Sequence, residues 1–549
     1  MNETPTNKPG RRISRALLIW LASFTLIALA LGIALITTDS APKKLPDIVW
    51  SLLFGVLGAS ILVCLLVFIH WLGCWRNLRR ALVGLAIFAT LIALFYTEED
   101  WRGKRAWENC KRELEAKGAV LDWDKYIPPP VPDDQNFFKS PKMQEWFQRN
   151  SPGFTASYTN ELYGLLTNAD KVAVITNATA AANFLAWSDQ FQPDLDLIRD
   201  ALKRPYARMD GNYSRPFGIP IPNFVSSRIL AQALAQRAKC HLLFGQPEKA
   251  LREVMLLNDS RHLLERAPTG KPMLLVDAMV NVTITELYVN TIADGLQKQA
   301  WQEPQLAALQ KQLEKINLPQ LVVESFNTEQ AASTCTLETT PGYKVADLLS
   351  GVGFSVDKNK TSAFRLRLKN PMYLLILSAP RGWVYLNMVT DAQLLQKEIE
   401  AVDTGKQLIS PRAMNNAAAD MNATFGHASP YNYIAAMMIP NFIKAWQTTA
   451  KNQTLVNEAQ VVCALERYHL THGEYPETLD ALVPQFIEKL PHDVIGGQPS
   501  QGSGSAGQPL HYRRTADGKF VLYSVGWNET DDGGTASDKM DQGDWVWRN

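Results

Sequence analysis

The sequence predicts a multi-domain membrane protein with three transmembrane helices, a mainly α-helical outer domain and a C-terminal α+β module in which a long helix packs on a small antiparallel sheet. Three observations predict this fold class. Long uncharged runs gather in the first hundred residues, helical spacing of apolar residues dominates the middle, and a strand–turn–strand pattern lies near the end. A chain of 549 residues also exceeds one ordinary core, so we expect several folded units.

Residues 16–96 predict a three-span membrane region. Ala16–Thr37 holds no charge over 22 residues, which is about 33 Å as a helix and enough to cross a bilayer. Val49–Trp71 is a second run without Lys, Arg, Asp or Glu, and Ala81–Tyr96 is a third that is short and needs help from its flanks. The alternative for the first run is a cleaved signal peptide, but the run is too long and no small-residue cleavage pattern stands out.

Basic residues beside the spans predict the orientation, because Lys and Arg are retained on the cytoplasmic side. They are Lys8, Arg11, Arg12 and Arg15 in a cytoplasmic tail of residues 1–15, and Arg76, Arg79 and Arg80 between the second and third spans. Lys43 and Lys44 in the first outer loop count against this orientation. Because more basic residues favour this orientation than oppose it, we expect the N-terminus on the cytoplasmic side of the membrane and everything after Tyr96 on the outer side.

Residues 97–140 predict a helix followed by a Pro-rich connector. Lys104–Gly118 has the composition of a solvated helix, with Gly118 as a natural C-cap. Ile127–Phe137 contains three successive prolines, which remove hydrogen-bond donors and favour an extended backbone. We interpret it as a rigid spacer that lifts a domain off the membrane, rather than as a ligand for a proline-binding module.

Residues 141–335 predict an α-helical domain. Ser226–Leu257 has the pattern of a helical hairpin that turns at Gly245–Pro247. Its "FGQPEKAL" segment is similar to the central turn of a tetratricopeptide repeat (TPR), but a single match leaves a generic α-helical domain as the alternative. Met273–Gln297 and Pro304–Ile316 predict further amphipathic helices.

Residues 336–430 carry a weaker signal. Met372–Pro380 is apolar, but nine residues cannot cross a bilayer as a helix, so we expect a buried helix or strand. Asn415–Ser429 is rich in Ala and Asn and is interpreted as a linker into the terminal module.

Residues 431–549 predict the α+β module. A long helix ends at Gly473, with its apolar residues mostly on one face, and a second short helix is expected between Pro476 and Pro484. Leu510–Thr515 alternates apolar and polar residues, an Asp-Gly turn follows, and "KFVLYSVG" returns as the second strand of a β-hairpin.

Six carboxylates fall within sixteen residues after this hairpin, interrupted by glycines. They are Glu529, Asp531, Asp532, Asp538, Asp541 and Asp544. Ca²⁺ takes six to eight oxygen ligands, and a glycine-rich loop can turn both carboxylates and backbone carbonyls inward. The alternative is a solvated acidic loop that binds nothing specifically.

The segments "ALERYHLTHGEYPETLDALVP" and "FVLYSVGWNETDDGG", followed by "GDWVW", resemble the major pseudopilins of type II secretion and the related type IV pilin-like fold. The resemblance covers about a fifth of the chain. The whole chain looks like envelope proteins of bacteria such as Verrucomicrobia and Planctomycetes. The resemblance implies a bacterial inner (cytoplasmic) membrane protein whose large C-terminal part is periplasmic.

The same resemblance implies a calcium site. The carbonyl of Val525 and the side chains of Asp531 or Asp532 and of Asp544 would be ligands, with Asn528 and Asp541 as additions. Pseudopilins usually place another aspartate where this chain has Gln542.

The chain departs from pilins in the parts that polymerise. The apolar run Tyr433–Ile443 is too short to anchor in a membrane, and no processed glycine followed by an early glutamate precedes it. We therefore expect a membrane-anchored periplasmic scaffold or accessory protein, acting beside envelope secretion or pilus proteins. The alternative is an envelope enzyme or a solute-binding protein with its site in the helical domain. A net charge of +1 gives no reason to expect nucleic acid as a partner.

No catalytic residues are assigned. The six cysteines show no metal-ligand spacing, and His469 and His472 lack a third ligand in a zinc-hydrolase pattern. The four cysteines beyond the spans would face an oxidising compartment and could form up to two disulfides. They are Cys110, Cys240, Cys335 and Cys463.

Overall fold

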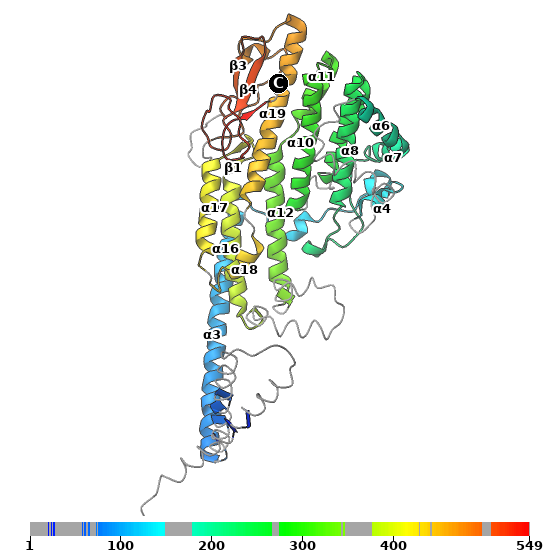
Figure 1. The fold of residues 1–549 in the computed structure, drawn as a ribbon. Coiled ribbons are helices and arrows are strands. Elements are labelled where there is room, and N and C mark those ends of the chain that lie inside the picture. Colours follow the sequence, from blue (N-terminus) through cyan, green and yellow to red (C-terminus); the bar gives the residue numbers. More distant parts are fainter. Residues whose placement is uncertain are drawn as a thin grey trace, which may run out of the picture. The chain divides into compact units, whose positions relative to one another are not determined.

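The computed structural model describes residues 75–148, 178–265, 274–341, 376–427, 429–439, 442–496 and 507–547, with residues 344–345 and single positions between 20 and 73. The chain divides into two compact units, Met1–Glu98 and Glu99–Asn549. Most of the described residues are helical, and the sheets are small and antiparallel (Figure 1).

Among its described residues, the second unit contains a series of helices and two small antiparallel sheets. Its α-helices are α4 (Met143–Phe147), α6 (Ala178–Ser188), α7 (Gln192–Ala201), α8 (Phe224–Leu243), α9 (Pro247–Arg261), α10 (Leu275–Gln297), α11 (Glu303–Leu313), α12 (Leu318–Thr339), α16 (Arg381–Glu400), α17 (Pro411–Phe425), α18 (Tyr433–Met438) and α19 (Ile443–His472). Its strands are β1 (Val402–Asp403), β2 (Leu408–Ile409), β3 (His511–Arg514), β4 (Phe520–Ser524) and β5 (Trp545–Val546).

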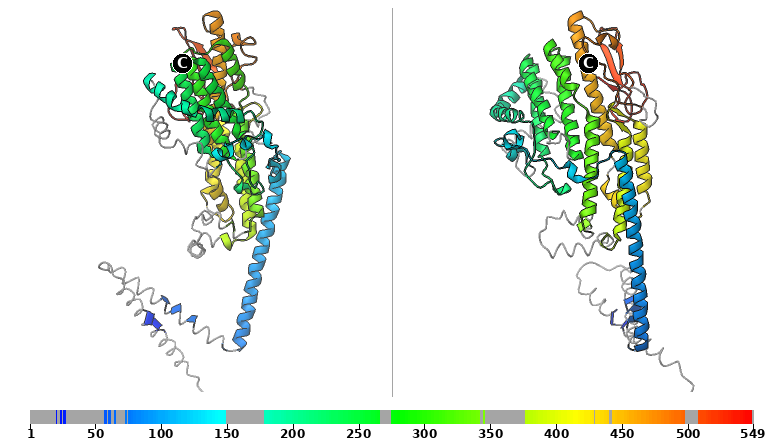
Figure 2. Two further views of the ribbon diagram at one scale, coloured as in Figure 1. Left: turned by 90° about the vertical axis from the view of Figure 1, so that its right-hand side faces the viewer. Right: turned by 180° about the vertical axis from the view of Figure 1, so that it is seen from behind.

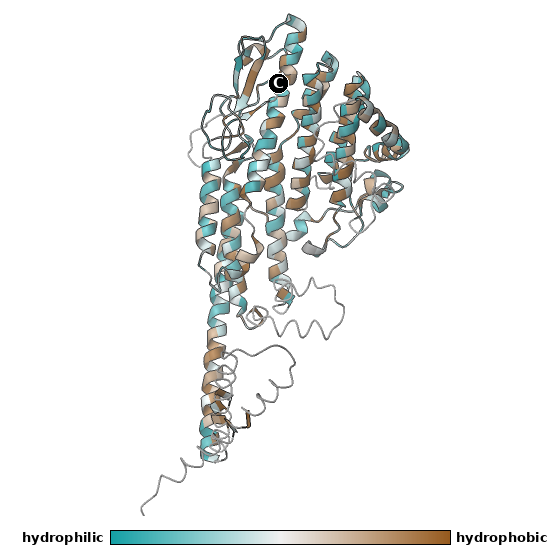
Figure 3. Cartoon of the chain, viewed as in Figure 1, coloured by the Kyte–Doolittle hydropathy of each residue, from teal (hydrophilic) through white to brown (hydrophobic). Residues whose placement is uncertain are grey.

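Helix α3 (Trp75–Ala116) is the one described helix that is long and apolar enough to cross a membrane. Its most apolar window is not buried at all, in contrast to the core helix of a soluble protein. Figure 3 shows apolar residues gathered along this part of the helix. Helix α3 contains the predicted third span, residues 81–96, and is consistent with membrane anchoring through that segment. The other two predicted spans lie almost entirely outside the described residues, so the number of spans and their orientation stay predictions.

The third predicted span and the predicted solvated helix form one continuous helix. From Glu99 onward, α3 belongs to the second unit and buries a stripe of Gly103, Trp107, Cys110 and Leu114. The expectation of a fully solvated helix is therefore wrong for this face, because charged residues between the stripe positions hide it in the sequence. The helix ends close to the predicted C-cap.

The backbones of α3 and α16 touch where Gly103 meets Gly382. A Cβ atom on Gly382 would lie 1.9 Å from the carbonyl oxygen of Glu99, and one on Gly103 would lie 2.2 Å from that of Gly382. The Gly382 N–H donates to Asp100 Oδ1 at 2.7 Å, and Trp383 Nε1 donates to Glu99 Oε2 at 2.9 Å. The start of the second unit is thus fastened to the N-terminus of α16 through a contact that leaves no room for a side chain.

The Pro-rich segment packs into the second unit. The Phe137 N–H donates to the Tyr206 carbonyl at 2.7 Å, and Asn136 Nδ2 donates to the Arg208 carbonyl at 2.7 Å. Phe137 and Phe138 are buried, with ring centroids 5.1 Å apart. The aromatic residues that follow the prolines therefore draw this segment into the core, and it does not stand apart as the expected rigid spacer.

Helices α8 and α9 form the predicted hairpin, with Gly245 in a left-handed conformation at the turn. Ala231 and Ala238 are completely buried, which lets the two helices approach closely. Arg237 Nε donates to Glu253 Oε1 at 3.0 Å, and both side chains are buried. The hairpin is confirmed, and its kinship to TPR repeats stays a prediction.

The segment predicted as a linker, Asn415–Ser429, is helical over most of its length in α17. Met414, Ala417 and Met421 are buried at helical spacing, and α17 packs against α16. Alanine favours a helix, and this helix buries Ala417 between the two methionines. The prediction of a linker is therefore corrected.

The apolar segment Met372–Pro380 is described only from Ile376 onward. Ile376 is helical and buried, in line with the expected buried element. It belongs to a core cluster that also contains Trp107 of α3 and Ile434 of α18.

Cys110, Cys240, Cys335 and Cys463 are all free thiols. The disulfides that these four residues could form are therefore absent from the structure. Cys110, Cys240 and Cys463 are buried apolar side chains, and burial raises the pKa of each thiol.

Helix α19 packs on an antiparallel sheet of order β3-β4-β5, and a short 3₁₀ helix (Leu479–Leu482) occupies the place of the expected second helix. However, the middle of α19 is buried on all sides, since every residue from Val456 to Leu465 is buried. It also packs against α10, α11 and α12, and these helices lie beside it in Figures 1 and 2. The expectation of one apolar face is wrong, because α19 is shared by the helices and the sheet.

Candidate functional site

The predicted calcium loop connects β4 to β5 and is organised by the buried carboxylate of Asp544. Asp544 Oδ1 accepts the N–H of Asp532 at 3.2 Å, and Oδ2 accepts those of Gly534 at 2.7 Å and Thr535 at 3.3 Å. Left-handed conformations at Gly533 and Gly534 belong to the same turn. Asp544 therefore holds the loop in place through backbone amides.

Asp531 lies at the surface beside strand β4. Its Oδ1 accepts hydrogen bonds from the Tyr523 hydroxyl at 3.0 Å and the Gly533 N–H at 2.9 Å, and its Oδ2 lies 3.5 Å from His511 Nδ1. The Gly533 amide, followed by the Tyr523 hydroxyl, lowers the pKa of Asp531. The carboxylate is therefore ionised at neutral pH, as either a metal ligand or a solvated loop requires.

The remaining predicted ligands are spread along the loop. Asn528 Nδ2 donates to Asp532 Oδ2 at 2.9 Å, Asp541 is exposed, and the Val525 N–H donates to Asp493. Within the described residues, which include all of 507–547, no three His, Cys, Asp or Glu side chains gather in a metal-holding arrangement. The calcium site stays a prediction.

Sequence analysis missed Asp493, which fixes the point where the acidic loop begins. Asp493 Oδ1 accepts the Ser524 hydroxyl at 2.7 Å and the Ile495 N–H at 3.0 Å, and Oδ2 accepts the Val525 N–H at 3.2 Å. The side chain is almost completely buried, and burial raises its pKa against the effect of these hydrogen bonds. The only sequence feature that could have indicated this role is slight: Asp493 directly precedes the apolar pair Val494 and Ile495.

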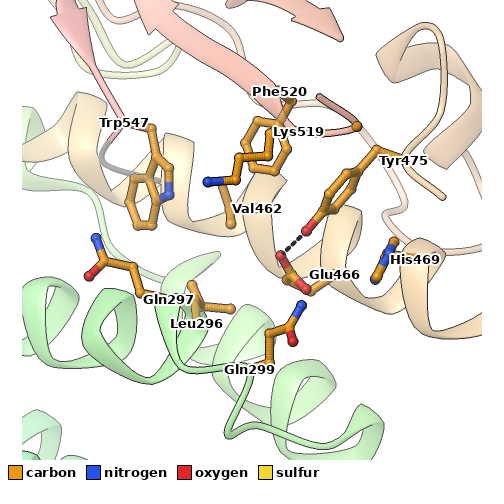
Figure 4. A pocket seen from close by; sticks show the side chains of 11 residues that line it. Leu296, Gln297, Gln299, Val462, Glu466, His469, Tyr475, Lys519, Phe520 and Trp547 are labelled. Carbon is orange, nitrogen blue, oxygen red and sulfur yellow. Dashed lines mark hydrogen bonds between the residues drawn. The ribbon is translucent and has the colours of Figure 1, made fainter. Parts of the chain in front are cut away.

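A pocket of about 260 Å³ lies where the end of α10, helix α19 and the β3–β4 turn meet (Figure 4). Its apolar base and its polar groups come from segments far apart in the chain. It is lined by Leu296, Gln297, Gln299, Val462, Glu466, His469, Tyr475, Gly518, Lys519, Phe520 and Trp547.

Glu466 and Tyr475 form the polar centre of this pocket. The Tyr475 hydroxyl donates to Glu466 Oε1 at 2.7 Å, and the His469 ring stacks on Tyr475 with centroids 4.6 Å apart. Burial raises the pKa of Glu466, and burial together with the neighbouring Glu466 raises the pKa of Tyr475. The phenol therefore remains protonated at neutral pH and acts as a hydrogen-bond donor.

Lys519 brings a positive charge to the same pocket. In Figure 4 its side chain extends across the pocket between Trp547 and Phe520, and the amides of Gln297 and Gln299 lie on the opposite wall. Apolar and aromatic surface combined with a few convergent polar groups is the usual make-up of a small-molecule site. The titratable groups in the lining are Glu466, His469, Tyr475 and Lys519.

The sequence did not predict this pocket. In the sequence His469 lies near the end of the predicted long helix and Tyr475 just beyond it, with nothing to link either residue to Lys519. A signal that could have pointed to the site is Glu466, an acid that directly follows an apolar stretch of the helix. Comparisons of the chain with known protein families, curated proteins and solved structures find no match.

Proposed function

We propose that the chain is a membrane-anchored binding protein of the bacterial envelope, and that its second unit takes up a small anionic molecule in the pocket between α10, α19 and the β3–β4 turn. The observation that carries the proposal is the position of Lys519 over an apolar base beside the Glu466–Tyr475 pair. The ammonium group recognises the anion, and Phe520 and Trp547 contact an aromatic or alkyl part of the ligand.

The proposed location follows from the sequence pattern. Three N-terminal spans in the inner membrane, with the N-terminus in the cytoplasm, expose the second unit to the periplasm. Helix α3 supports anchoring of this kind. A pocket on the periplasmic side suits a solute-binding or sensing role.

Replacing Lys519 with methionine is expected to weaken ligand binding by about tenfold to a hundredfold, because a hydrogen bond to a charged group contributes roughly 1.5–3 kcal/mol. Ligand-observed NMR on the full chain in nanodiscs would first screen carboxylates and phosphate monoesters that carry aromatic or alkyl groups. Calorimetry would then give the dissociation constants of the hits.

Lys298→Met is the matched control, since Lys298 is exposed between two lining residues but does not line the pocket. It should leave binding unchanged. Equal affinity in Lys519→Met and the unaltered protein, or no binder in the panel, would contradict the proposed site.

A second candidate function is an accessory role beside envelope secretion or pilus proteins. It is favoured by the long helix α19 packed on a sheet of order β3-β4-β5, the arrangement that the pseudopilin resemblance implies. In-cell cross-linking followed by purification of the chain should recover a component of such a machine. Recovery of none would count against this role.

Calcium is expected to raise the melting temperature of the full chain if the acidic loop is a metal site. A ligand at a hundred times its dissociation constant stabilises the folded state by about 2.7 kcal/mol. Asp532→Asn should reduce this effect, whereas Asp538→Asn, on the same loop but outside the predicted ligand set, should not. A melting temperature independent of Ca²⁺ would leave the loop as a solvated acidic segment.

A further inference from the structure

Exposed aromatic and apolar side chains surround the point at which the chain enters the second unit. Trp101 is 58% exposed, Tyr431 38%, and Leu377 and Met437 46% each. Large apolar side chains exposed elsewhere on this unit lie on separate elements, such as Leu197 on α7. We call the set Trp101, Arg102, Leu377, Tyr431 and Met437 the entry surface.

Contacts within the second unit hold the members of the entry surface together. The Arg102 guanidinium lies 5.0 Å from the centre of the Tyr431 ring, and Tyr431 meets Trp383 edge to face at 6.2 Å. Trp383 in turn donates a hydrogen bond to Glu99, which lies one turn before Arg102 on α3. The aromatic residues of α3 and those of the segment before α18 therefore share one neighbourhood.

Leu377 and Met437 join this neighbourhood through the adjacent core. Ile376, next to Leu377, packs in the same apolar cluster as Ile434, and Met438, next to Met437, packs against that cluster. Ile376 and Met438 therefore face the core of the second unit, whereas Leu377 and Met437 face solvent. The fold thus turns two large apolar side chains to the exterior beside a well-packed core.

The distance along the chain relates the entry surface to the predicted span. Trp101 is five residues beyond Tyr96, the last residue of the apolar stretch of α3, which is about 7.5 Å along a helix. The polar layer on each side of a bilayer is of the order of 5–8 Å thick, so Trp101 falls at its outer edge if α3 spans the membrane. Trp and Tyr are enriched in this layer, and Arg reaches lipid phosphates from it.

We propose that the entry surface is a lipid-docking surface, through which the second unit rests on the headgroup layer of the membrane that α3 enters. This inference depends on the proposed membrane anchoring and adds a second, peripheral contact to it. Trp101, Tyr431 and Met437 insert their apolar parts among the headgroups, and Arg102 meets the lipid phosphates.

The test uses the full chain reconstituted in vesicles of phosphatidylcholine and phosphatidylglycerol. One preparation carries a photoreactive diazirine in the acyl chain and another carries it in the headgroup, and mass spectrometry locates the labelled peptides. We expect the acyl probe to label residues 81–96 and the headgroup probe to label peptides that contain Tyr431 and Met437. These two residues are the informative ones, since they are far from the span in sequence. The peptide that contains Val225, exposed on α8, is the internal control.

The outcomes separate anchoring from docking. Labelling of 81–96 with no more headgroup labelling at Tyr431 and Met437 than at Val225 would overturn docking and leave anchoring intact. Absence of acyl labelling at 81–96 together with absence of headgroup labelling at Tyr431 and Met437 would overturn both anchoring and docking. The double variant Tyr431→Ser/Met437→Ser should reduce headgroup labelling of the peptide that contains Leu377, the third member of the entry surface that is far from the span in sequence. Val225→Ser should leave that labelling unchanged. Both substitutions affect exposed side chains, so the fold should persist.

Discussion

Replacing Gly382 with alanine is expected to destabilise the second unit by about 3 kcal/mol or more, a large effect for a single methyl group. The added Cβ would lie 1.9 Å from the carbonyl oxygen of Glu99 and 2.4 Å from its carbonyl carbon, so backbone must move against backbone. Helix propensity alone predicts the opposite, because alanine is favoured over glycine inside a helix by about 1 kcal/mol. The sign of the change in melting temperature therefore tests the contact directly.

Gly405→Ala is the control for this substitution. A Cβ at Gly405 would meet only Asp403 Oδ1, at an ordinary 3.5 Å, and the residue is exposed. Its melting temperature should stay close to that of the unaltered protein. Hydrogen exchange gives a second readout, since Gly382→Ala should accelerate exchange in residues 99–116. Similar stability of the two variants would show that α3 and α16 do not touch at this point.

The second large effect is expected for Trp446→Ala on α19, with a loss of about 3–5 kcal/mol. Trp446 is completely buried and stacks on Phe326 with ring centroids 5.0 Å apart. Its Nε1 donates to Glu398 Oε2 at 2.9 Å, and burial raises the pKa of Glu398 to about 7. The alanine variant leaves both a cavity and a buried carboxyl group without its donor, and each of these costs free energy.

Two further variants separate these contributions. Trp446→Phe keeps most of the ring but loses the donor, so it should fall between the unaltered protein and Trp446→Ala. Leu470→Ala, on the same helix but 56% exposed, should change stability by no more than about 0.5 kcal/mol. Thermal unfolding followed by circular dichroism would rank the four proteins. Equal melting temperatures for Trp446→Ala and Leu470→Ala would refute the central position of α19.

Local patterns predicted the elements whose signal lies within one segment. The α8–α9 hairpin, the β3–β4 hairpin and the end of α19 at Gly473 follow from helical periodicity, an Asp-Gly turn and a left-handed glycine. Burial of α19 on all sides was not predicted, because Gln453, Asn457 and Glu458 look like a solvated face in the sequence. In the structure Gln453 donates to the Ile316 carbonyl and Asn457 to the His492 carbonyl. Such partners, distant in the chain, cannot be read from a local pattern.

The candidate site was harder to predict than the fold. The acidic loop was found from its composition, but the role of Asp544 in binding backbone amides depends on a turn geometry that composition does not give. The pocket joins Gln299, Glu466 and Lys519 from three segments, and only the packing of α10, α19 and the sheet brings them together. Contacts between segments that lie far apart in the chain produce no local sequence pattern, so a single sequence does not reveal such a site.

The burial of α19 has a consequence for how the protein is made. Helices α10, α11 and α12 leave the ribosome more than a hundred residues before α19 is complete, a delay of roughly 7–27 s at 5–20 residues per second. During this interval the apolar faces that α19 will cover have no partner on the chain already synthesised. Synthesis therefore yields an open helical half first, and the core of the second unit closes only when the last fifth of the polypeptide is made. A chain that stops before Ile443 is expected to be recognised by chaperones and proteases, even if its earlier helices have formed.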